Sequence, residues 1–293
     1  METKVTKEME FTAGSRIVRE KKEKRSRFVK YFETADKGCA AVVYPDAVHF
    51  EENGEWKEID HTLVEDERGG FANRAADMKV RFAKEAGKEP LVEVKKDGYV
   101  LSWDVVNEKK SGKFEKLAVK MEAEADEKDD IRAFNLKKMV HRGHCSGGTY
   151  HEVCPGVDLE YRLQGENLKE NIFLNTKAAL GTRVVFRLSH KGLEAVREKD
   201  GSILLCPEGK PEKAVFYLDA PYMYDAAGAM SAAVQYQVEP VEEGSLLTVV
   251  PDRVWMESSE RVLLVVVPPH LTVRRQVSEG IPRNASHLPS FLS

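Results

Sequence analysis

Apolar and charged residues alternate strictly over positions 157–163 of the chain. The apolar set is Val157, Leu159, Tyr161 and Leu163, and the charged set is Asp158, Glu160 and Arg162. Side chains on a β-strand point to opposite faces in turn, so this pattern predicts a strand with one buried and one solvated face. We therefore expect the apolar set to be buried and the charged set to be exposed.

Turn dipeptides separate further strand-like runs. Asn53-Gly54, Asp97-Gly98 and Asp200-Gly201 favour the tight turns that join antiparallel strands. Other expected strands cover residues 41–44, 78–83, 171–175, 183–189, 203–206, 214–219, 234–238 and 261–267. Many short strands with turns between them indicate an all-β protein with an antiparallel β-sandwich architecture.

A charged stretch interrupts this pattern and predicts a division into two lobes. Phe114, Leu117, Ala118 and Met121 follow helical spacing, although Leu117, Val119 and Met121 also alternate as in a short strand. We expect a charged, partly helical connector; the alternative is one sheet system with a long surface insertion. The expected parts are a basic N-terminal arm (1–30), an N-terminal β lobe (31–107), the connector (108–140), a C-terminal β-sandwich lobe (141–273) and a flexible tail (274–293).

Composition and charge exclude few classes of protein. The net charge of -4, from 45 basic and 49 acidic residues, gives no global field that would attract nucleic acid. The first residues lack the apolar segment of a secretory signal, and the longest apolar run, 262–267, is far short of the roughly 20 residues of a membrane span. We expect no signal peptide and no transmembrane segment in this chain.

Several segments together resemble the N-terminal β-rich region of bacterial wall-associated, RHS (YD-repeat) and DNRLRE domain-containing surface proteins. They are 43–50, 54–63, Asn73, 79–82 and 97–103 in the first lobe, and 150–163, 168–172, Gly192-Leu193, Asp200-Gly201 and 220–225 in the second. Leu263-Leu264 and Pro268-Pro269 replace the family's usual closing Tyr-Pro and Asp-Pro pattern, and the tail after Val273 does not resemble the start of the family's downstream modules. We therefore expect a truncated or degraded member.

The resemblance implies a secreted or cell-surface protein. Its partners would be adjacent domains of a larger surface protein or cell-wall polymer, with no nucleic acid among them. The resemblance supplies no catalytic motif, cofactor or metal.

The densest group of metal-ligand residue types is His141, His144, Cys145, His151 and Cys154. Imidazole and thiolate groups bind zinc, but the spacing fits no ordinary zinc finger, and solvated loop residues are the simpler interpretation. We expect no metal. Cys145 and Cys154 could instead form a disulfide if the protein is exported.

Other chemistry has ordinary explanations. Asp158, Glu160 and Glu170 could be imagined as paired carboxylates for glycoside hydrolysis, yet charges on a strand usually form its solvated face. Trp56 is the best candidate for an exposed sugar-stacking ring, whereas Trp103 shares the phase of apolar neighbours and should lie in the core. The basic run 16–30 could contact phosphates, but a solvated arm is the simpler interpretation.

The sequence therefore predicts no catalytic, cofactor-binding or metal-binding residue. The leading hypothesis is a non-enzymatic structural or assembly module of an exported multidomain protein. One alternative is a carbohydrate- or cell-wall-binding module, which exposed coplanar aromatic rings would favour. Another is a hydrolase without a recognisable motif, which convergent carboxylates in a cleft would favour.

Overall fold

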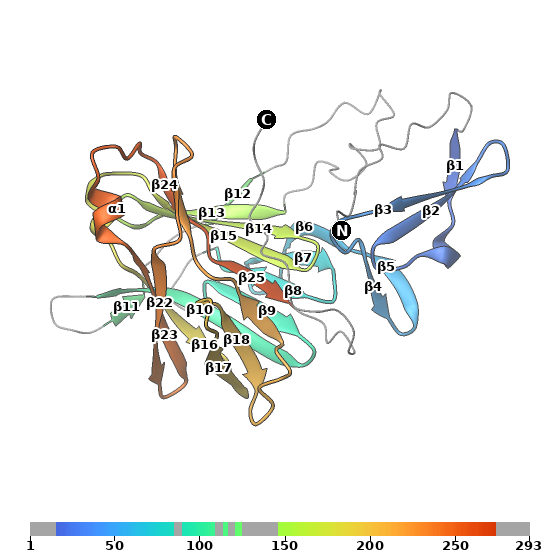
Figure 1. Ribbon diagram of the computed structural model, residues 1–293. Helices are drawn as coiled ribbons and strands as arrows, with labels where there is room; N and C mark the ends of the chain where they lie inside the picture. Colours follow the sequence, from blue (N-terminus) through green and yellow to red (C-terminus); the bar gives the residue numbers. More distant parts are fainter. Residues whose placement is uncertain (1–15, 85–89, 109–113, 117–120, 125–145, 274–293) are drawn as a thin grey trace.

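The computed structural model describes residues 16–84, 90–108, 114–116, 121–124 and 146–273 (Figure 1). Within these ranges, nearly all regular structure is β-strand in antiparallel pairs, which confirms the expected all-β class. A short helix, α1 (Arg253–Glu257), and the 3-10 turns Lys22–Lys24 and Ala178–Gly181 complete the regular elements.

Two large sheets pack face to face as the layers of a sandwich (Figure 1). Among the described residues, the first sheet contains β6 (Asp60–Glu65), β7 (Phe71–Ala75), β8 (Lys79–Phe82), β9 (Val92–Lys96), β10 (Tyr99–Glu108), β11 (Phe114–Lys116), β16 (Val184–Ser189), β22 (Val234–Val241) and β23 (Gly244–Pro251).

The second sheet includes the strictly alternating segment 157–163. Among the described residues it contains β12 (Met121–Glu124), β13 (Gly147–Cys154), β14 (Val157–Gln164), β15 (Asn167–Leu174), β17 (Leu193–Arg197), β18 (Ile203–Pro207), β19 (Phe216–Leu218), β20 (Met223–Asp225), β21 (Met230–Ser231), β24 (Val265–Val267) and β25 (His270–Val273). All four apolar side chains of 157–163 are buried, as expected. Of the three charged ones, Arg162 is exposed, whereas Asp158 and Glu160 are partly buried by their neighbours.

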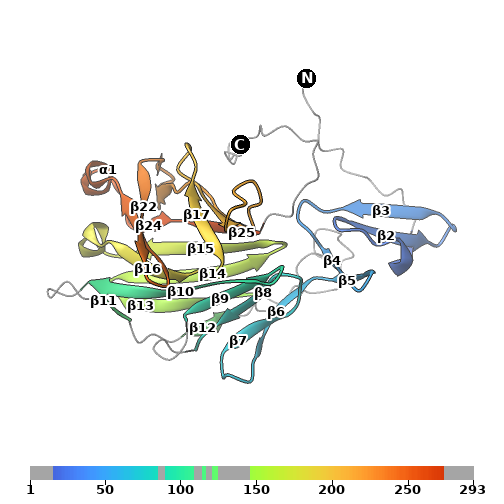
Figure 2. The same ribbon diagram turned by 90° about the horizontal axis from the view of Figure 1, so that it is seen from below.

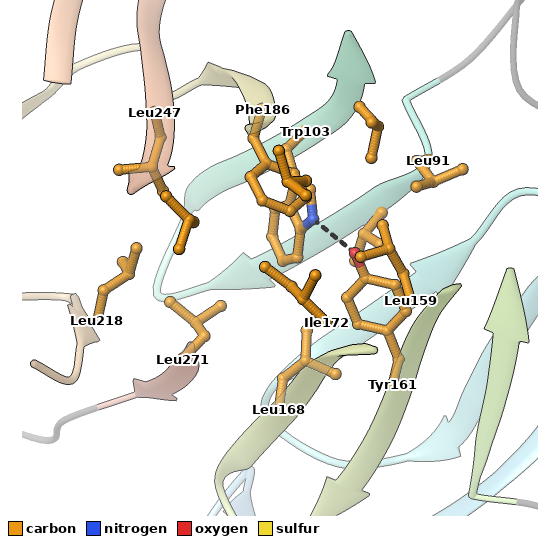
Figure 3. Packing of buried hydrophobic residues seen from close by; sticks show 14 of the residues in the cluster. Leu91, Trp103, Leu159, Tyr161, Leu168, Ile172, Phe186, Leu218, Leu247 and Leu271 are labelled. Carbon is orange, nitrogen blue, oxygen red and sulfur yellow. Dashed lines mark hydrogen bonds between the residues drawn. The ribbon is translucent and has the colours of Figure 1, made fainter. Parts of the chain in front are cut away.

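The core lies between the sheets (Figure 3). Trp103 of β10 and Phe186 of β16 face Tyr161, Ile172 and other apolar side chains of the second sheet. Trp103 is only 6% exposed, which confirms its expected place in the core. Removal of these large apolar side chains from water is the main force that holds the two sheets together.

The smaller sheets formed by residues 16–58 lie to one side of the sandwich (Figure 2). One contains β1 (Ile17–Glu20), β2 (Val29–Thr34) and β3 (Cys39–Val43), and the other is the hairpin of β4 (His49–Glu52) and β5 (Glu55–Glu58). We call residues 16–58 the N-terminal block.

All three expected turns join adjacent antiparallel strands. Asn53-Gly54 connects β4 to β5, Asp97-Gly98 connects β9 to β10, and Asp200-Gly201 lies between β17 and β18. Both residues of the first two turns have positive φ, the backbone conformation that these dipeptides favour.

Strand pairing links sequence regions that were expected to form separate lobes. β10 pairs with β16, with Val105 opposite Phe186, so one sheet contains strands from both sides of the expected connector. Within the connector, Phe114–Lys116 and Met121–Glu124 are strands, and the intervening residues 117–120 lie outside the described ranges. The limits of the expected arm, lobes and connector stay a prediction. The flexible tail at 274–293 stays a prediction too, because it lies outside the described ranges.

No helix in the described part of the chain is both long and apolar enough to cross a membrane.

Candidate functional site

The outer face of the second sheet gathers polar and aromatic side chains from β13, β14, β15 and β20. β14 pairs with β15, β15 with β24, and β24 with β20. Residues directly opposite each other in neighbouring strands point to the same face. The register therefore places Asp158, Phe173 and Tyr224 in one row, with Val266 between the two rings. We call this surface the outer face.

A histidine and a carboxylate form one end of this row. His151 Nδ1 lies 3.4 Å from Asp158 Oδ2, and the histidine side chain is 51% exposed. Asp158 also accepts hydrogen bonds from the backbone N–H of Glu152 at 2.7 Å and from Asn175 Nδ2 at 2.9 Å. The carboxylate is therefore held in place, and it can orient the imidazole.

The next row centres on Glu160. Arg162 donates from Nε and Nη2 to the two carboxylate oxygens, each at 3.0 Å, and Asn171 Nδ2 donates to Oε1 at 3.0 Å. Burial opposes ionisation, but the hydrogen bonds from Arg162 and Asn171 lower the pKa of the Glu160 carboxyl below its usual value. Glu160 is thus a fixed anion that holds the exposed guanidinium of Arg162 on the outer face.

The third row adds a second cation. Register pairs Arg162 with Lys169 of β15, and Lys169 Nζ donates to Gln164 Oε1 at 2.8 Å. The outer face therefore alternates cations, carboxylates and amides along β14 and β15.

Two tyrosines lie along the β20 side of the outer face. The rings of Tyr222 and Tyr224 stack with centroids 6.3 Å apart and planes 26° from parallel, and both are partly buried. Burial raises the pKa of both hydroxyls, and the charge of Glu160 also contributes to the shift at Tyr224. That contribution agrees with the register, which places Tyr224 and Glu160 on the same face.

Glu170 lies on the opposite side of the same sheet. It is on the strand next to Asp158 and Glu160, as expected, but its carboxyl points into the core and cannot act together with theirs. Trp103 Nε1 donates to Tyr161 Oη at 3.2 Å, and Tyr161 Oη donates to Glu170 Oε1 at 2.5 Å (Figure 3 shows the first bond). Burial raises the pKa of Glu170 to about 8, although the hydrogen bond from Tyr161 lowers it.

A cavity of about 30 Å³ borders Glu170 between the sheets, with Trp103, Phe186 and leucine side chains in its lining. This volume holds a water molecule or two but no substrate.

The expected metal-ligand group is not assembled in the described part of the chain. Cys154 is buried among core residues, whereas His151 lies on the outer face. His141, His144 and Cys145 lie outside the described ranges, and no group of three or more metal-ligand side chains occurs within those ranges. The possible Cys145–Cys154 disulfide therefore remains untested.

The basic run 16–30 is not the solvated arm that its composition suggested. The side chains of Arg25 and Arg27 are only 9% and 12% exposed. Arg25 donates to Glu20 through Nε at 2.7 Å, and Arg27 donates through Nε to Glu166 at 3.0 Å. Glu166 is far from Arg27 in sequence, so composition alone could not reveal this pair.

The remaining aromatic candidates are dispersed. Trp56 is partly buried on the β4–β5 hairpin, and Trp255 packs against the core with the guanidinium of Arg261 4.3 Å from its ring. From the sequence, we did not expect Phe173, Tyr222 and Tyr224 to lie on one surface. The available signal was the alternation of Tyr222 and Tyr224 around buried Met223, which placed both rings on the polar face of a strand.

Comparison with known proteins finds relatives that are named as nucleases. The chain is 26% identical over 254 residues to the tRNA3(Ser)-specific nuclease WapA of Bacillus spizizenii and to the tRNA(Glu)-specific nuclease WapA of Bacillus subtilis subsp. natto. The same identity and length are found for the tRNA nuclease WapA of Bacillus subtilis strain 168. The match covers 84% of this chain and 10% of each relative. No family model matches, and no solved structure matches.

These relatives overturn four expectations from the sequence. The resemblance to RHS and DNRLRE surface proteins is not supported, because the relatives found are tRNA nucleases. The relatives' names also contradict the interpretation as a non-enzymatic structural module, the expectation that the protein is not an enzyme, and the exclusion of nucleic acid as a partner.

Those errors have a physical origin. Net charge, the basic run 16–30 and catalytic motifs were the sequence criteria that were applied, and none of them indicated a nucleic-acid partner or an enzyme.

Proposed function

We propose that this chain is part of a tRNA-cleaving nuclease and that its outer face contacts the RNA. The observation that carries this proposal is the similarity to three tRNA nucleases over 84% of the chain. The chain spans about a tenth of those relatives' length, so the assignment of their substrate to this chain is part of the proposal. A secreted or cell-surface location belongs to the proposal as well.

The chemistry of the outer face suits RNA. Guanidinium and ammonium groups neutralise phosphates, and the Arg162 fork presents several donors in one plane. Amides such as Asn171 and Asn175 can donate to and accept from base edges or ribose hydroxyls. Partly exposed rings such as Phe173 offer flat apolar surface for bases.

Charge balance on the outer face predicts modest affinity. The face has two cations, Arg162 and Lys169, so it can contact about two phosphates, and the nearby carboxylates of Asp158 and Glu160 weaken those contacts. For a single-stranded RNA, the logarithm of the binding constant should then fall with the logarithm of the salt concentration with a slope of roughly -1.4. Binding should therefore depend more on contacts with bases than binding by a strongly basic groove does.

Fluorescence anisotropy with labelled tRNA tests the proposal. We expect Arg162→Gln together with Lys169→Gln to weaken binding about tenfold, because both phosphate contacts are lost. Arg19→Gln is the matched control: Arg19 of β1 pairs with Glu33 of β2, and its side chain is 67% exposed. No binding of tRNA by the wild-type chain, or equal loss in both variants, would overturn the proposal.

A second candidate function is cleavage by this chain itself. The His151–Asp158 pair favours it, since an exposed imidazole oriented by a carboxylate can remove a proton from a ribose hydroxyl. We expect His151→Ala to abolish tRNA cleavage and Asp158→Asn to reduce it, while tRNA binding persists. Cleavage that survives in His151→Ala at the wild-type rate would exclude this role.

A further inference from the structure

Tyr222 and Tyr224 form a distinct feature at the β20 side of the outer face. They flank Met223, which is fully buried, so the backbone between the two rings is anchored in the core. Their ring planes differ by 26°, and their centroids are 6.3 Å apart. Two neighbouring rings are therefore presented in nearly parallel orientation at the start of β20.

One row of the sheet leads from this pair across the outer face to β14. Tyr224 is opposite Val266, Val266 is opposite Phe173, and Phe173 is opposite Asp158. Adjacent strands are about 4.8 Å apart, so the four-strand row spans roughly 14 Å. Arg162 and Lys169 pair with each other four residues further along β14 and β15, about 13 Å from this row. A single strand of a few nucleotides can extend over both, with its bases on the rings and its phosphates near these two cations.

We propose that Tyr222 and Tyr224, with Phe173, stack unpaired bases, so that the outer face takes single-stranded RNA segments and not duplex. This inference rests on the proposed function, because it names the kind of RNA that the same face binds. Stacking needs the flat surface of a base, which is available in loops, bulges and ends. Bases in an A-form duplex are covered above and below by their neighbours, so the rings could not reach them.

The mixed charge of the outer face fits the same ligand. A duplex presents two closely spaced rows of phosphates, which the carboxylates of Asp158 and Glu160 would repel. In a single strand the bases can turn toward the rings, and only occasional phosphates need a cation. Asn171 and Asn175 then have access to the base edges, which are not occupied by pairing.

Anisotropy with two matched probes tests this inference. One probe is a labelled single-stranded RNA oligonucleotide, and the other is the same strand annealed to its complement. We expect the single strand to bind about fivefold or more tightly than the duplex. Tyr222→Ala and Tyr224→Ala should each weaken single-strand binding about fivefold or more, and leave duplex binding unchanged.

Three further variants separate stacking from folding. Tyr224→Phe keeps the ring and should bind like the wild type, whereas Tyr224→Leu keeps apolar volume without the aromatic face and should bind like Tyr224→Ala. Tyr31→Ala, which removes a partly buried ring from β2 in the N-terminal block, should have no effect on binding. Thermal melts of each variant report whether the fold is intact.

The outcomes separate the two proposals. Equal affinity for both probes, or full single-strand binding by Tyr224→Leu, would overturn the stacking inference. The proposed function would still stand in that case if Arg162→Gln together with Lys169→Gln weakens tRNA binding. Failure of the wild-type chain to bind tRNA and both probes would overturn the proposed function, and the stacking inference with it.

Discussion

Glu170 lies in an environment that disfavours the ionised form of its carboxyl. Its carboxyl is buried beside the cavity, where it accepts a hydrogen bond from the hydroxyl of Tyr161. Tyr236 is also within electrostatic reach, and its buried hydroxyl has no partner among the described residues. Because this environment disfavours a negative charge, Glu170 keeps its proton at neutral pH.

This raised pKa predicts a pH-dependent stability. The pKa of Glu170 is about 8 in the folded chain against 4.5 for an ordinary glutamate. The folded state binds the proton more tightly, so the stabilisation is complete below pH 4.5 and is lost as pH rises toward 8, by up to roughly 5 kcal/mol. Denaturant melts from about pH 5 to 9 should show the decline in the wild type and a much flatter profile in Glu170→Gln. If the unfolding free energies of the wild type and Glu170→Gln changed with pH in parallel, Glu170 would not be protonated in the folded chain.

Alternation along β14 predicts unequal effects of two neighbouring truncations. Leu159 is fully buried, so Leu159→Ala should destabilise the chain by about 2–5 kcal/mol through lost burial and a new cavity. Glu160→Ala should cost about 1 kcal/mol, since Glu160 lies on the outer face and accepts from Arg162 and Asn171. Equal losses of unfolding free energy in the two variants would count against the strand orientation.

At the scale of elements, short-range signals predicted the strands well. Period-two patterns and turn dipeptides located β9, β10, β14 and β15, because hairpin pairing is local in sequence. The same rules could not show that Arg25 and Arg27 pack, because their burial is set by tertiary contacts. They also could not predict that Glu170 is buried. The pattern of a strand shows which residues share a face, and Glu170 is a charged residue type on the otherwise apolar, buried face of β15.

Close approach between β13 and β14 gives a prediction for one glycine. A Cβ on Gly147 would lie 2.3 Å from the backbone oxygen of Tyr161, a distance that no side chain adjustment can relieve. Gly147→Ala should therefore separate the two strands and cost about 1–3 kcal/mol. Gly181→Ala is the control, since nothing lies within 4 Å of the position that its Cβ would take. Equal melting temperatures for the two variants would contradict this strand spacing.

At the scale of the whole molecule, the turn between β14 and β15 joins the N-terminal block to the sandwich. Arg27 donates to Glu166, Gln164 Nε2 donates to Asp46 Oδ2 at 2.6 Å, and the His61 ring contacts the Gly165 carbonyl at 2.8 Å. The first two contacts cross from the block to this turn, and the third fixes the turn against β6. Arg27 also lies 3.7 Å from Asp77, and Lys79 of β8 lies over the ring of Phe50, so polar and cation–ring contacts both hold the block against the sandwich.

Loss of one of these contacts should loosen the N-terminal block selectively. We expect Arg27→Met to increase hydrogen exchange in β1 to β5, because it leaves Glu166 without its guanidinium, while β14 and β15 keep their protection. Arg19→Met, which breaks an exposed ion pair between β1 and β2, is the control and should change little. Exchange that rises uniformly over the whole chain would contradict independent docking of the block.

The sequence indicated the architecture far better than the function. Fold class follows from local periodicity, whereas the outer face is assembled from β14, β15 and β20, which are brought together by pairing through β24. Tyr224 and Glu160 are far apart in sequence, and no motif spacing connects them. Only the strand register reveals that cations, amides and rings share one surface.

Photocrosslinking of bound tRNA, followed by mass spectrometric identification of the modified peptides, tests whether RNA contacts the outer face. We expect crosslinks in peptides that contain Phe173 of β15 and Tyr222 and Tyr224 at β20, with fewer crosslinks when Arg162 and Lys169 are changed to glutamine. Crosslinks confined to the N-terminal block, or to the first sheet of the sandwich, would contradict an RNA contact at the outer face.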